Sequence, residues 1–427
     1  MIALAALLAS PPMIDELVSA AQVGDFDVSP DGARVIFAWD RLGDWDLFTV
    51  PIAGGEPHLL VGERGDDRAP RHSPDGARVA YEGAGEGGAA DVFVVAASGG
   101  EARNLTRAAG SDHLIGWLAG GERLLVRADR GGKGFDLYAV DAVTGEGDAL
   151  TRGGRVREAA LAGDRMRVAF VTEERGDRGR LQTIDLSLSP SLSRSHSRRR
   201  ARPARGPNVL SPRGAPSWFA DGRILLAAFD TGPGRIGLWA PGKRAGNRAI
   251  DWQAGFSPEE GAPVASPLGD SYARLRYGDG AVEVRVASLS SRGDRAVATA
   301  EGTTRNVAWL PDTREIVFDR ESSRMPRSLL AAPAHVSSAE APAEARVIVY
   351  GAARLAPERL AAALPVWVPR EGGAPLPAWL YAPHPPRARR GVIIVEEGPR
   401  GRVAPRFAPL AQALVVQGDR VLVSASA

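Results

Sequence analysis

The chain has 427 residues, of which 44% are hydrophobic and 24% charged, an ordinary composition for a soluble globular protein. It has no cysteine, which excludes disulfides, thiolate metal sites and a cysteine nucleophile. The formal net charge is +2, but residues 187–206 alone hold six arginines and no acid, so the rest of the chain is mildly acidic. The basic balance therefore does not indicate a nucleic-acid-binding surface.

Residues 1–22 form an apolar lead-in that we expect to end in a short helix. The apolar run Ile2 to Leu8 has no Lys or Arg before it and is shorter than a normal secretory signal. No apolar run in the chain approaches the ~20 residues of a membrane span. We expect a cytoplasmic protein without membrane contact. The alternative is a signal remnant and a periplasmic location.

A sequence repeat organises residues 23–346. VSPDGARVIFA at 28–38 recurs as HSPDGARVAYE at 72–82, and five weaker copies follow at spacings of 43 to 58 residues. The third residues of the seven predicted turns are Asp31, Asp75, Gly120, Gly163, Asp221, Gly269 and Asp312. Proline, aspartate and glycine suit such turns because proline presets φ, aspartate bonds its own backbone and glycine accepts a positive φ.

Each repeat holds four short β-like runs. The third run begins with an acid, as in DLFTV at 46–50, DVFVV at 91–95 and DLYAV at 136–140, and a Gly-rich turn follows it. Four strands in about 40–45 residues, repeated, are typical of a β-propeller blade. Seven copies predict a seven-bladed β-propeller. Separate β-sandwich domains would not keep one period over so many residues.

The long spacing between the fourth and fifth repeats contains the Ser/Arg-rich segment 187–206. It has no apolar pattern, so we expect a disordered surface insert. An RNA- or phosphate-binding arm is the less favoured alternative, because no aromatic residues accompany the arginines. A frame-shifted stretch of DNA would also produce this composition.

The pattern changes over residues 347–427. Two β-like runs surround a Gly-Gly turn in 365–383, and GVIIV at 391–395 follows as a buried strand that ends in a glycine-containing loop. FAPLAQALVVQG has helical apolar spacing and stops at Gly418, and DRVLVSASA begins another strand. This order is the start of an α/β domain with a parallel sheet, which four elements cannot complete.

On these repeats and this tail, the chain resembles the S9 (prolyl oligopeptidase) family of serine peptidases, especially its acylaminoacyl-peptidase-like branch. The repeats also resemble those of TolB. The resemblance implies an all-β seven-bladed β-propeller followed by an incomplete α/β-hydrolase-type segment. It also implies a serine-type peptidase that hydrolyses oligopeptides, in which the propeller restricts access to the active site. We expect no cofactor and no metal.

Two departures from the S9 pattern concern catalysis. Where the family has His-Gly-Gly-Pro, whose backbone helps to form the oxyanion hole, this chain has Glu396, Glu397, Gly398 and Pro399. Carboxylates there oppose the stabilisation of an oxyanion. The chain also contains no G-x-S-x-G nucleophile elbow, and it ends before the position of that elbow and of the Asp and His that follow. We assign no catalytic residue and expect no peptidase activity from this chain.

No other group of residues predicts a site. The six histidines include no H-x-x-x-H pair, and His72 is expected in a blade core or rim. The acidic pairs Asp66–Asp67, Glu173–Glu174 and Glu259–Glu260 lie in loop-like sequence and are expected to be solvated. Trp117, Trp218 and Trp309 precede their turns at equivalent positions and are expected in blade cores.

Three hypotheses follow. The first is an S9 peptidase-like protein truncated within its hydrolase domain, with peptides as the ligands of its propeller. The second is a TolB-like propeller module that binds a protein or peptide partner on its face, with no nucleic acid involved. The third is a gene fragment without a function of its own.

Overall fold

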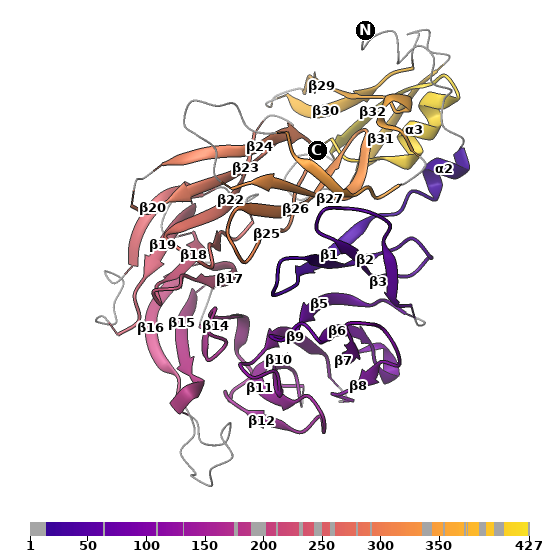
Figure 1. Ribbon diagram of the computed structural model, residues 1–427. Coiled ribbons are helices and arrows are strands. Elements are labelled where there is room, and N and C mark those ends of the chain that lie inside the picture. The colour runs from indigo at the N-terminus through magenta and orange to yellow at the C-terminus, as the bar shows by residue number, and fades with distance from the viewer. Residues whose placement is uncertain are drawn as a thin grey trace.

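The computed structural model describes residues 14–425, except 63–64, 108–109, 131, 175–177, 189–201, 211, 230–233, 243–249, 257–260, 279–280, 291–292, 335–343, 353–354, 371–372, 374, 384–389 and 397–404. In this part of the chain, seven four-stranded antiparallel sheets follow one another and an eighth, mixed sheet ends the chain (Figure 1). The architecture is propeller-like, with four strands to a sheet and few helices.

The seven antiparallel sheets each use four strands in chain order. The first three sheets are β1 (Val23–Val28), β2 (Arg34–Trp39), β3 (Asp46–Pro51) and β4 (His58–Val61); β5 (Arg68–His72), β6 (Arg78–Ala84), β7 (Ala90–Ala96) and β8 (Arg103–Asn104); and β9 (Asp112–Trp117), β10 (Arg123–Ala128), β11 (Asp136–Asp141) and β12 (Gly147–Ala149). The next two are β13 (Val156–Leu161), β14 (Arg167–Glu173), β15 (Arg178–Asp185) and β16 (Ala204–Leu210); and β17 (Pro212–Trp218), β18 (Ile224–Ala228), β19 (Gly234–Trp239) and β20 (Ile250–Phe256). The last two are β21 (Val264–Ala265), β22 (Ser271–Tyr277), β23 (Ala281–Ser288) and β24 (Asp294–Glu301); and β25 (Val307–Trp309), β26 (Glu315–Ser322), β27 (Met325–Pro333) and β28 (Arg346–Val349).

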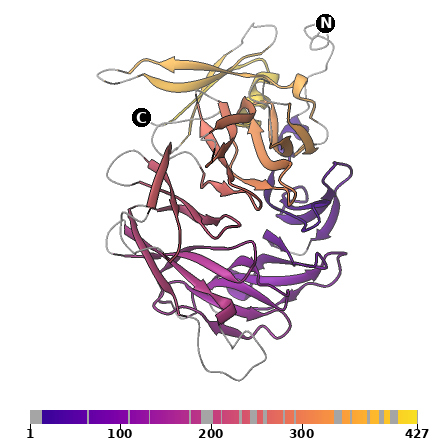
Figure 2. The same ribbon diagram turned by 60° about the vertical axis from the view of Figure 1, so that its left-hand side comes forward.

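The first strands of successive sheets lie side by side, as β1 with β5, β9 with β13, and β13 with β17. Each sheet therefore presents its first strand toward a common centre, and Figure 2 shows the sheets arranged around it. Hydrophobic cores fill the spaces between neighbouring sheets. The first and seventh sheets share one such core, in which Phe37 and Trp39 pack with Val317 and Leu329.

The turns after β1 and β5 have the chemistry expected from the sequence. In the first sheet the Ser29 hydroxyl donates to Asp31 Oδ1 at 2.5 Å and the Ala33 amide donates to the same oxygen at 3.0 Å. These two bonds hold the pKa of Asp31 below its usual range. The second sheet repeats the arrangement around Asp75.

Two of the predicted turn positions are wrong by one residue. In the fourth sheet Asp164, rather than Gly163, occupies the place of Asp31, because its Oδ1 accepts the Met166 amide two residues on. In the sixth sheet the Ser266 amide bonds the Ser271 carbonyl, as Ser29 bonds Arg34, so Leu268 rather than Gly269 is the third turn residue. In both turns a glycine lies next to the third position, so alignment of the repeats by sequence alone is wrong by one residue.

The three predicted core tryptophans tie neighbouring sheets together. Each Nε1 donates to a carbonyl oxygen on the first strand of the preceding sheet: Trp117 to Arg71 at 2.9 Å, Trp218 to Ala160 at 3.3 Å and Trp309 to Val264 at 3.0 Å. All three rings are buried. The prediction of core positions is confirmed, and the indole N–H groups are satisfied as buried polar groups require.

The C-terminal sheet has the strand order β29 (Ala363–Val368), β30 (Leu376–Tyr381), β32 (Arg420–Ala425), β31 (Gly391–Glu396). The β31–β32 pair is parallel and the other two pairs are antiparallel. Helix α3 (Pro409–Val416) connects β31 to β32 and ends before Gly418, which has a φ of 93°. These runs match the strands and helix expected for residues 365–425. The expected burial of GVIIV is wrong, because β31 is the last strand of this sheet and Ile393 and Val395 on one of its faces are 68% and 61% exposed.

The N-terminal helix α2 (Ile14–Val18) packs against the C-terminal segment (Figure 1). Leu17 is fully buried in a cluster with Leu355, Phe407 and Ala413. Glu16 and Arg359 form an ion pair at 3.0 Å. Helix α2, near the N-terminus, is therefore packed against the C-terminal segment by both apolar and ionic contacts. Three short 3₁₀ turns, η1 (Glu86–Gly88), η2 (Leu186–Leu188) and η4 (Pro357–Arg359), complete the elements of the described residues.

Two predicted boundaries are shifted by strand pairing. The end of the 187–206 insert overlaps β16, in which Ala204 pairs with Thr183 and Arg205 with Gln182. Residues 189–201 of that insert lie outside the described residues. The sequence predicts that the C-terminal segment begins at residue 347. Residues Val347 and Val349 instead belong to β28, which pairs with β27 and completes the seventh sheet.

Candidate functional site

The predicted oxyanion-loop remnant lies at the end of β31. Glu396 is the last residue of this strand, and its backbone is paired with Ala425 of β32. Glu397, Gly398 and Pro399 lie outside the described residues. The first residue of the predicted oxyanion loop therefore lies at the end of a parallel strand.

The C-terminal segment is held on the seventh sheet by Gln412 of α3. This side chain is buried, and its Nε2 donates to the carbonyl oxygens of Ser323, at 2.8 Å, and Ala361, at 2.9 Å. Its Oε1 accepts the Ala361 amide at 2.9 Å. Ser323 lies in the turn between β26 and β27, and its Oγ accepts the Ala363 amide at 3.1 Å. The Gln412 amide group therefore connects helix α3, the residues before β29 and the β26–β27 turn of the seventh sheet.

A buried charge cluster supports that turn. Arg327 Nη2 bonds Glu321 at 2.7 Å, and its Nε lies 3.6 Å from Asp319. Asp319 accepts the backbone N–H groups of Arg305 and Asn306, while burial raises the pKa of its carboxyl. Burial also lowers the pKa of Arg320 to about 10. The Arg320 guanidinium lies 5.0 Å from the centre of the Phe318 ring, and its Nε and Nη2 have no hydrogen-bond partner among the described residues. The bonds of Arg327 and Asp319 therefore support the docking turn.

The three described histidines, His58, His72 and His113, do not come together in one group. His72 Nδ1 lies 2.9 Å from Asp27 of the preceding sheet, and His113 Nδ1 lies 3.1 Å from Glu82. His72 is buried, as expected for a core position. His58 begins β4, and His196, His335 and His384 lie outside the described residues. Within the described ranges no cluster of His, Asp and Glu side chains has the arrangement of a metal site, and no helix is long and apolar enough to cross a membrane.

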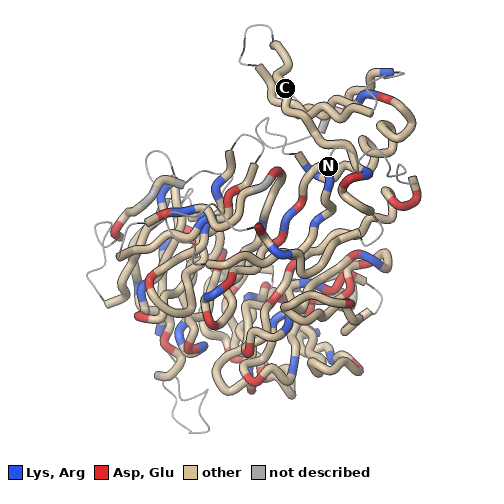
Figure 3. Tube along the Cα trace, turned by 45° about the horizontal axis from the view of Figure 1, so that its top comes forward, with Lys and Arg blue, Asp and Glu red and all other residues tan. Residues whose placement is uncertain are grey.

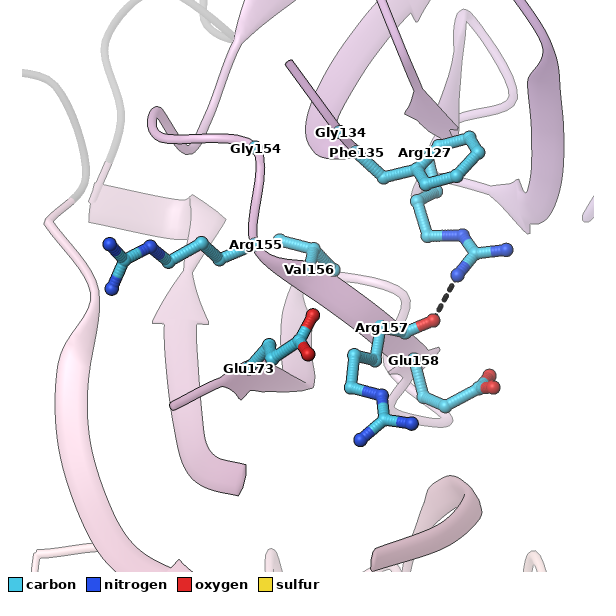
Figure 4. Close-up of a pocket in the computed structure, with 9 residues that line it drawn as sticks. All are labelled: Arg127, Gly134, Phe135, Gly154, Arg155, Val156, Arg157, Glu158 and Glu173. Atoms are coloured by element: carbon cyan, nitrogen blue, oxygen red, sulfur yellow. Dashed lines mark hydrogen bonds between the residues drawn. The ribbon is translucent and has the colours of Figure 1, made fainter. Parts of the chain in front are cut away.

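A pocket of ≈ 290 Å³ opens between the third and fourth sheets (Figure 4). It lies where the β10–β11 turn of the third sheet meets the start of β13, at the centre of the sheets. The two sheets join there through a parallel bridge between Phe135 and Arg155 and a 2.9 Å bond from the Val156 amide to the Phe135 carbonyl. Its lining residues are Arg127, Gly134, Phe135, Gly154, Arg155, Val156, Arg157, Glu158 and Glu173.

Two glycines allow the two sheets to approach at the pocket. A Cβ on Gly154 would lie 1.9 Å from the Lys133 carbonyl oxygen, and one on Gly134 would lie 2.2 Å from the Gly154 carbonyl oxygen. Their φ angles are 63° and 91°. Only glycine combines this backbone conformation with this closeness. The floor of the pocket is therefore set by the run RGGR at 152–155.

A β-bulge aims the charged residues of β13. Val156 pairs with Thr172 and Glu158 with Val171, so Arg157 is the extra residue between them. A bulge leaves its extra residue outside the ladder and redirects the side chain. Arg127 Nη1 donates to the Arg157 carbonyl oxygen, and its guanidinium lies 4.6 Å from the centre of the Phe135 ring. Arg127 is therefore tied to the pocket wall.

The remaining charges of the pocket are free to meet a ligand. The guanidinium groups of Arg155 and Arg157 have no hydrogen bond or ion pair with any described residue, and both residues are exposed. Glu158 and Glu173 stand beside them on neighbouring strands (Figure 4). Three arginines against two glutamates leave one net positive charge. Elsewhere on the propeller-like part, basic and acidic residues are interspersed (Figure 3).

The sequence interpretation missed this pocket and was wrong about two of the acidic pairs. Glu173, expected in a solvated loop, ends strand β14 and lines the pocket, and Asp67 is buried. The available signal was the run RGGRVRE at 152–158, in which Arg155 and Arg157 flank Val156 at the start of a predicted strand. Glu259–Glu260 lies outside the described residues.

Comparisons with known proteins agree on the fold. The family model for the TolB beta propeller domain matches residues 22–189, and no curated protein matches the sequence. A prolyl endopeptidase structure matches with a TM-score of 0.67 at 15% identity, over 98% of this chain and 64% of its own. A puromycin-hydrolysing peptidase of Mycobacterium tuberculosis matches with a TM-score of 0.68 at 15% identity, over 97% and 68%. This chain thus spans about two thirds of either peptidase, and the predicted likeness to S9 peptidases and TolB propellers is confirmed as one of fold.

Proposed function

We propose that the chain is an S9 peptidase-like protein: a closed seven-bladed propeller that admits peptides, joined to the first elements of an α/β-hydrolase domain. The observation that carries this proposal is the C-terminal sheet. Its order β29-β30-β32-β31, with one parallel pair joined through α3, is an α/β arrangement fastened to the seventh sheet by Gln412 and Ser323. Coverage of 97% or more of this chain by both peptidase structures supports the assignment of this sheet to the hydrolase domain.

Closure of the propeller at seven blades is supported by contacts between its ends. Val23, Phe37 and Trp39 of the first sheet share a core with Val317 and Leu329 of the seventh. A ring closed in this way surrounds a central channel with the first strands of all seven sheets. Such a channel admits extended peptides and excludes folded proteins.

The 427-residue chain is expected to bind peptides without cleaving them. It contains no G-x-S-x-G sequence, so no serine stands on a nucleophile elbow. We expect no covalent labelling of the purified chain by a fluorophosphonate probe, with a full-length S9 peptidase as the positive control. Labelling of a serine in this chain, located by mass spectrometry, would contradict the inactivity.

A TolB-like binding module is the second candidate, favoured by the match of residues 22–189 to the TolB propeller family. In that case the propeller face would hold a protein partner, and the C-terminal segment would be dispensable for binding. The two candidates differ in ligand. Micromolar binding of short unstructured peptides favours the first, and binding of a folded partner without binding of short peptides favours the second.

A further inference from the structure

The pocket between the third and fourth sheets has features that select a ligand. This inference rests on the peptide binding proposed above and specifies which part of a peptide is recognised. Arg155 and Arg157 flank Val156 at the start of a first strand, so both lie at the centre of the propeller-like part. Their guanidinium groups are unpaired among the described residues, whereas most other arginines in first and second strands bond a carboxylate or stack on a ring.

We infer that this pocket binds the carboxylate of a peptide, through the guanidinium groups of Arg155 and Arg157. A guanidinium presents paired N–H donors in a plane, which match the two oxygens of a carboxylate. Arg127 does not compete for the ligand, because it is bonded to the Arg157 carbonyl and stacked on Phe135. It holds the bulge that presents Arg157.

The two glutamates narrow the class of anion. Glu158 and Glu173 lower the net charge of the pocket to +1, which disfavours polyanions such as nucleic acid and suits a singly charged group. Their carboxylates also offer acceptors for the backbone N–H groups that precede a peptide carboxylate. The pocket of ≈ 290 Å³ has room for one to two residues.

The position of the pocket relates it to the C-terminal segment. It lies at the β10–β11 turn of the third sheet, and the C-terminal segment docks at Ser323 in the equivalent β26–β27 turn of the seventh sheet. Equivalent turns of a propeller lie on one face, so pocket and hydrolase-like segment share a face. A peptide held by its carboxylate in the pocket would extend over that face.

The test compares two dansylated peptides of sequence Ala-Ala-Ala-Ala-Phe, one with a free C-terminal carboxylate and one amidated, by fluorescence anisotropy with the full chain. We expect the free acid to bind at least about tenfold more tightly, the scale of one charge-assisted bidentate pair. In R155Q/R157Q this preference is expected to disappear. In E158Q/E173Q it is expected to increase, because the competing negative charges are gone.

R314Q is the matched control, because Arg314 lies in an exposed turn at the other end of the seventh sheet. It should keep the preference for the free acid. Circular dichroism and thermal unfolding establish that each variant is folded, and the exposed positions of Arg155 and Arg157 lead us to expect unchanged melting temperatures. An amidated peptide ending in Asp identifies the source of the carboxylate: binding equal to that of the free acid supports a site for either source, and weaker binding assigns the site to the peptide terminus.

Two outcomes would overturn the inference, and they are distinguishable. If both peptides bind with the same affinity, or if R155Q/R157Q keeps the preference, the pocket does not recognise a carboxylate although peptide binding stands. If none of the peptides binds the wild-type chain, the proposed peptide binding fails and the inference fails with it.

Discussion

Gln412 of helix α3 donates a 2.8 Å hydrogen bond to the carbonyl oxygen of Ser323, which lies 89 residues earlier in the turn between β26 and β27. Both residues are buried, and the same side chain satisfies the amide and the carbonyl of Ala361. A single side chain thus joins the C-terminal segment to the propeller-like sheets, which makes its removal a direct test of the docking.

Substituting Gln412 by alanine is expected to loosen the C-terminal segment by about 2–3 kcal/mol, because buried partners on Ser323 and Ala361 lose their hydrogen bonds. Hydrogen exchange of the amides in α3 and β32 measures the change. Leu410→Ala on the same helix is the control, since Leu410 is 61% exposed. Equal protection in Q412A and L410A would contradict the role of Gln412.

Replacing Trp117 by phenylalanine is expected to lower the free energy of unfolding by about 2 kcal/mol, because the Arg71 carbonyl loses its indole donor and a buried gap opens. The stacking of the Arg78 guanidinium, 4.8 Å from the ring centre, is weakened as well. Urea denaturation followed by circular dichroism gives the value. Trp367→Phe, at a ring that is 63% exposed, should change stability by less than about 0.5 kcal/mol.

An alanine at position 154 is expected to destabilise the chain by about 3 kcal/mol or more, because its Cβ would overlap the Lys133 carbonyl oxygen. Gly132→Ala is the matched control: its φ of 66° is close to the 63° of Gly154, but no atom lies within 4 Å of the added Cβ. The control isolates the strain of a positive φ, about 1 kcal/mol. Similar losses in G132A and G154A, measured by urea denaturation, would show that the two sheets can separate at the pocket.

Substituting Asp112 by asparagine is expected to alter the pH dependence of stability. Asp112 is fully buried, and burial raises the pKa of its carboxyl despite Thr106, Arg130 and His113 nearby. Because the folded-state pKa lies above the unfolded value, ionisation destabilises the native state as pH rises through the folded pKa. The stability of D112N relative to wild type should therefore increase from pH 4 to pH 7.

Urea titrations of both proteins at pH 4, 5.5 and 7 measure this difference. Asp221→Asn is a suitable control, because this carboxylate is exposed in a turn and pairs with Arg223 at 2.6 Å. A difference between D112N and wild type that stays constant over this range would show that Asp112 keeps its proton affinity on folding.

Most of the propeller-like fold was predictable because its information is local. A turn such as Ser29 to Gly32 is specified by four residues, and its hydrogen bonds form within the same stretch. Alternating apolar runs of four to eight residues then specify the strands. The predicted turn positions are wrong by one residue at Gly163 and Gly269. In both repeats a glycine lies beside the third turn position, which aspartate occupies in the first two repeats.

The candidate site was not predictable because its residues come together only between sheets. Arg127 lies in β10, Arg155 directly before β13 and Glu173 in β14, and no spacing along the chain marks them as neighbours. The bulge at Arg157 depends on pairing with Thr172 and Val171, which single-strand periodicity does not express. The burial of Asp67 likewise depends on the neighbouring sheet.

The amino-acid sequence by itself determined the repeat, the four-stranded units, the α/β order of the tail and the absence of a nucleophile elbow, because each is a property of residues close together in the chain. The tertiary structure alone decided which first strands meet, that Gln412 reaches Ser323, and that two arginines at the start of β13 remain unpaired among the described residues beside two glutamates. Those relations depend on the packing of one sheet on the next, where distances between side chains are set by the whole assembly of strands rather than by any one of them.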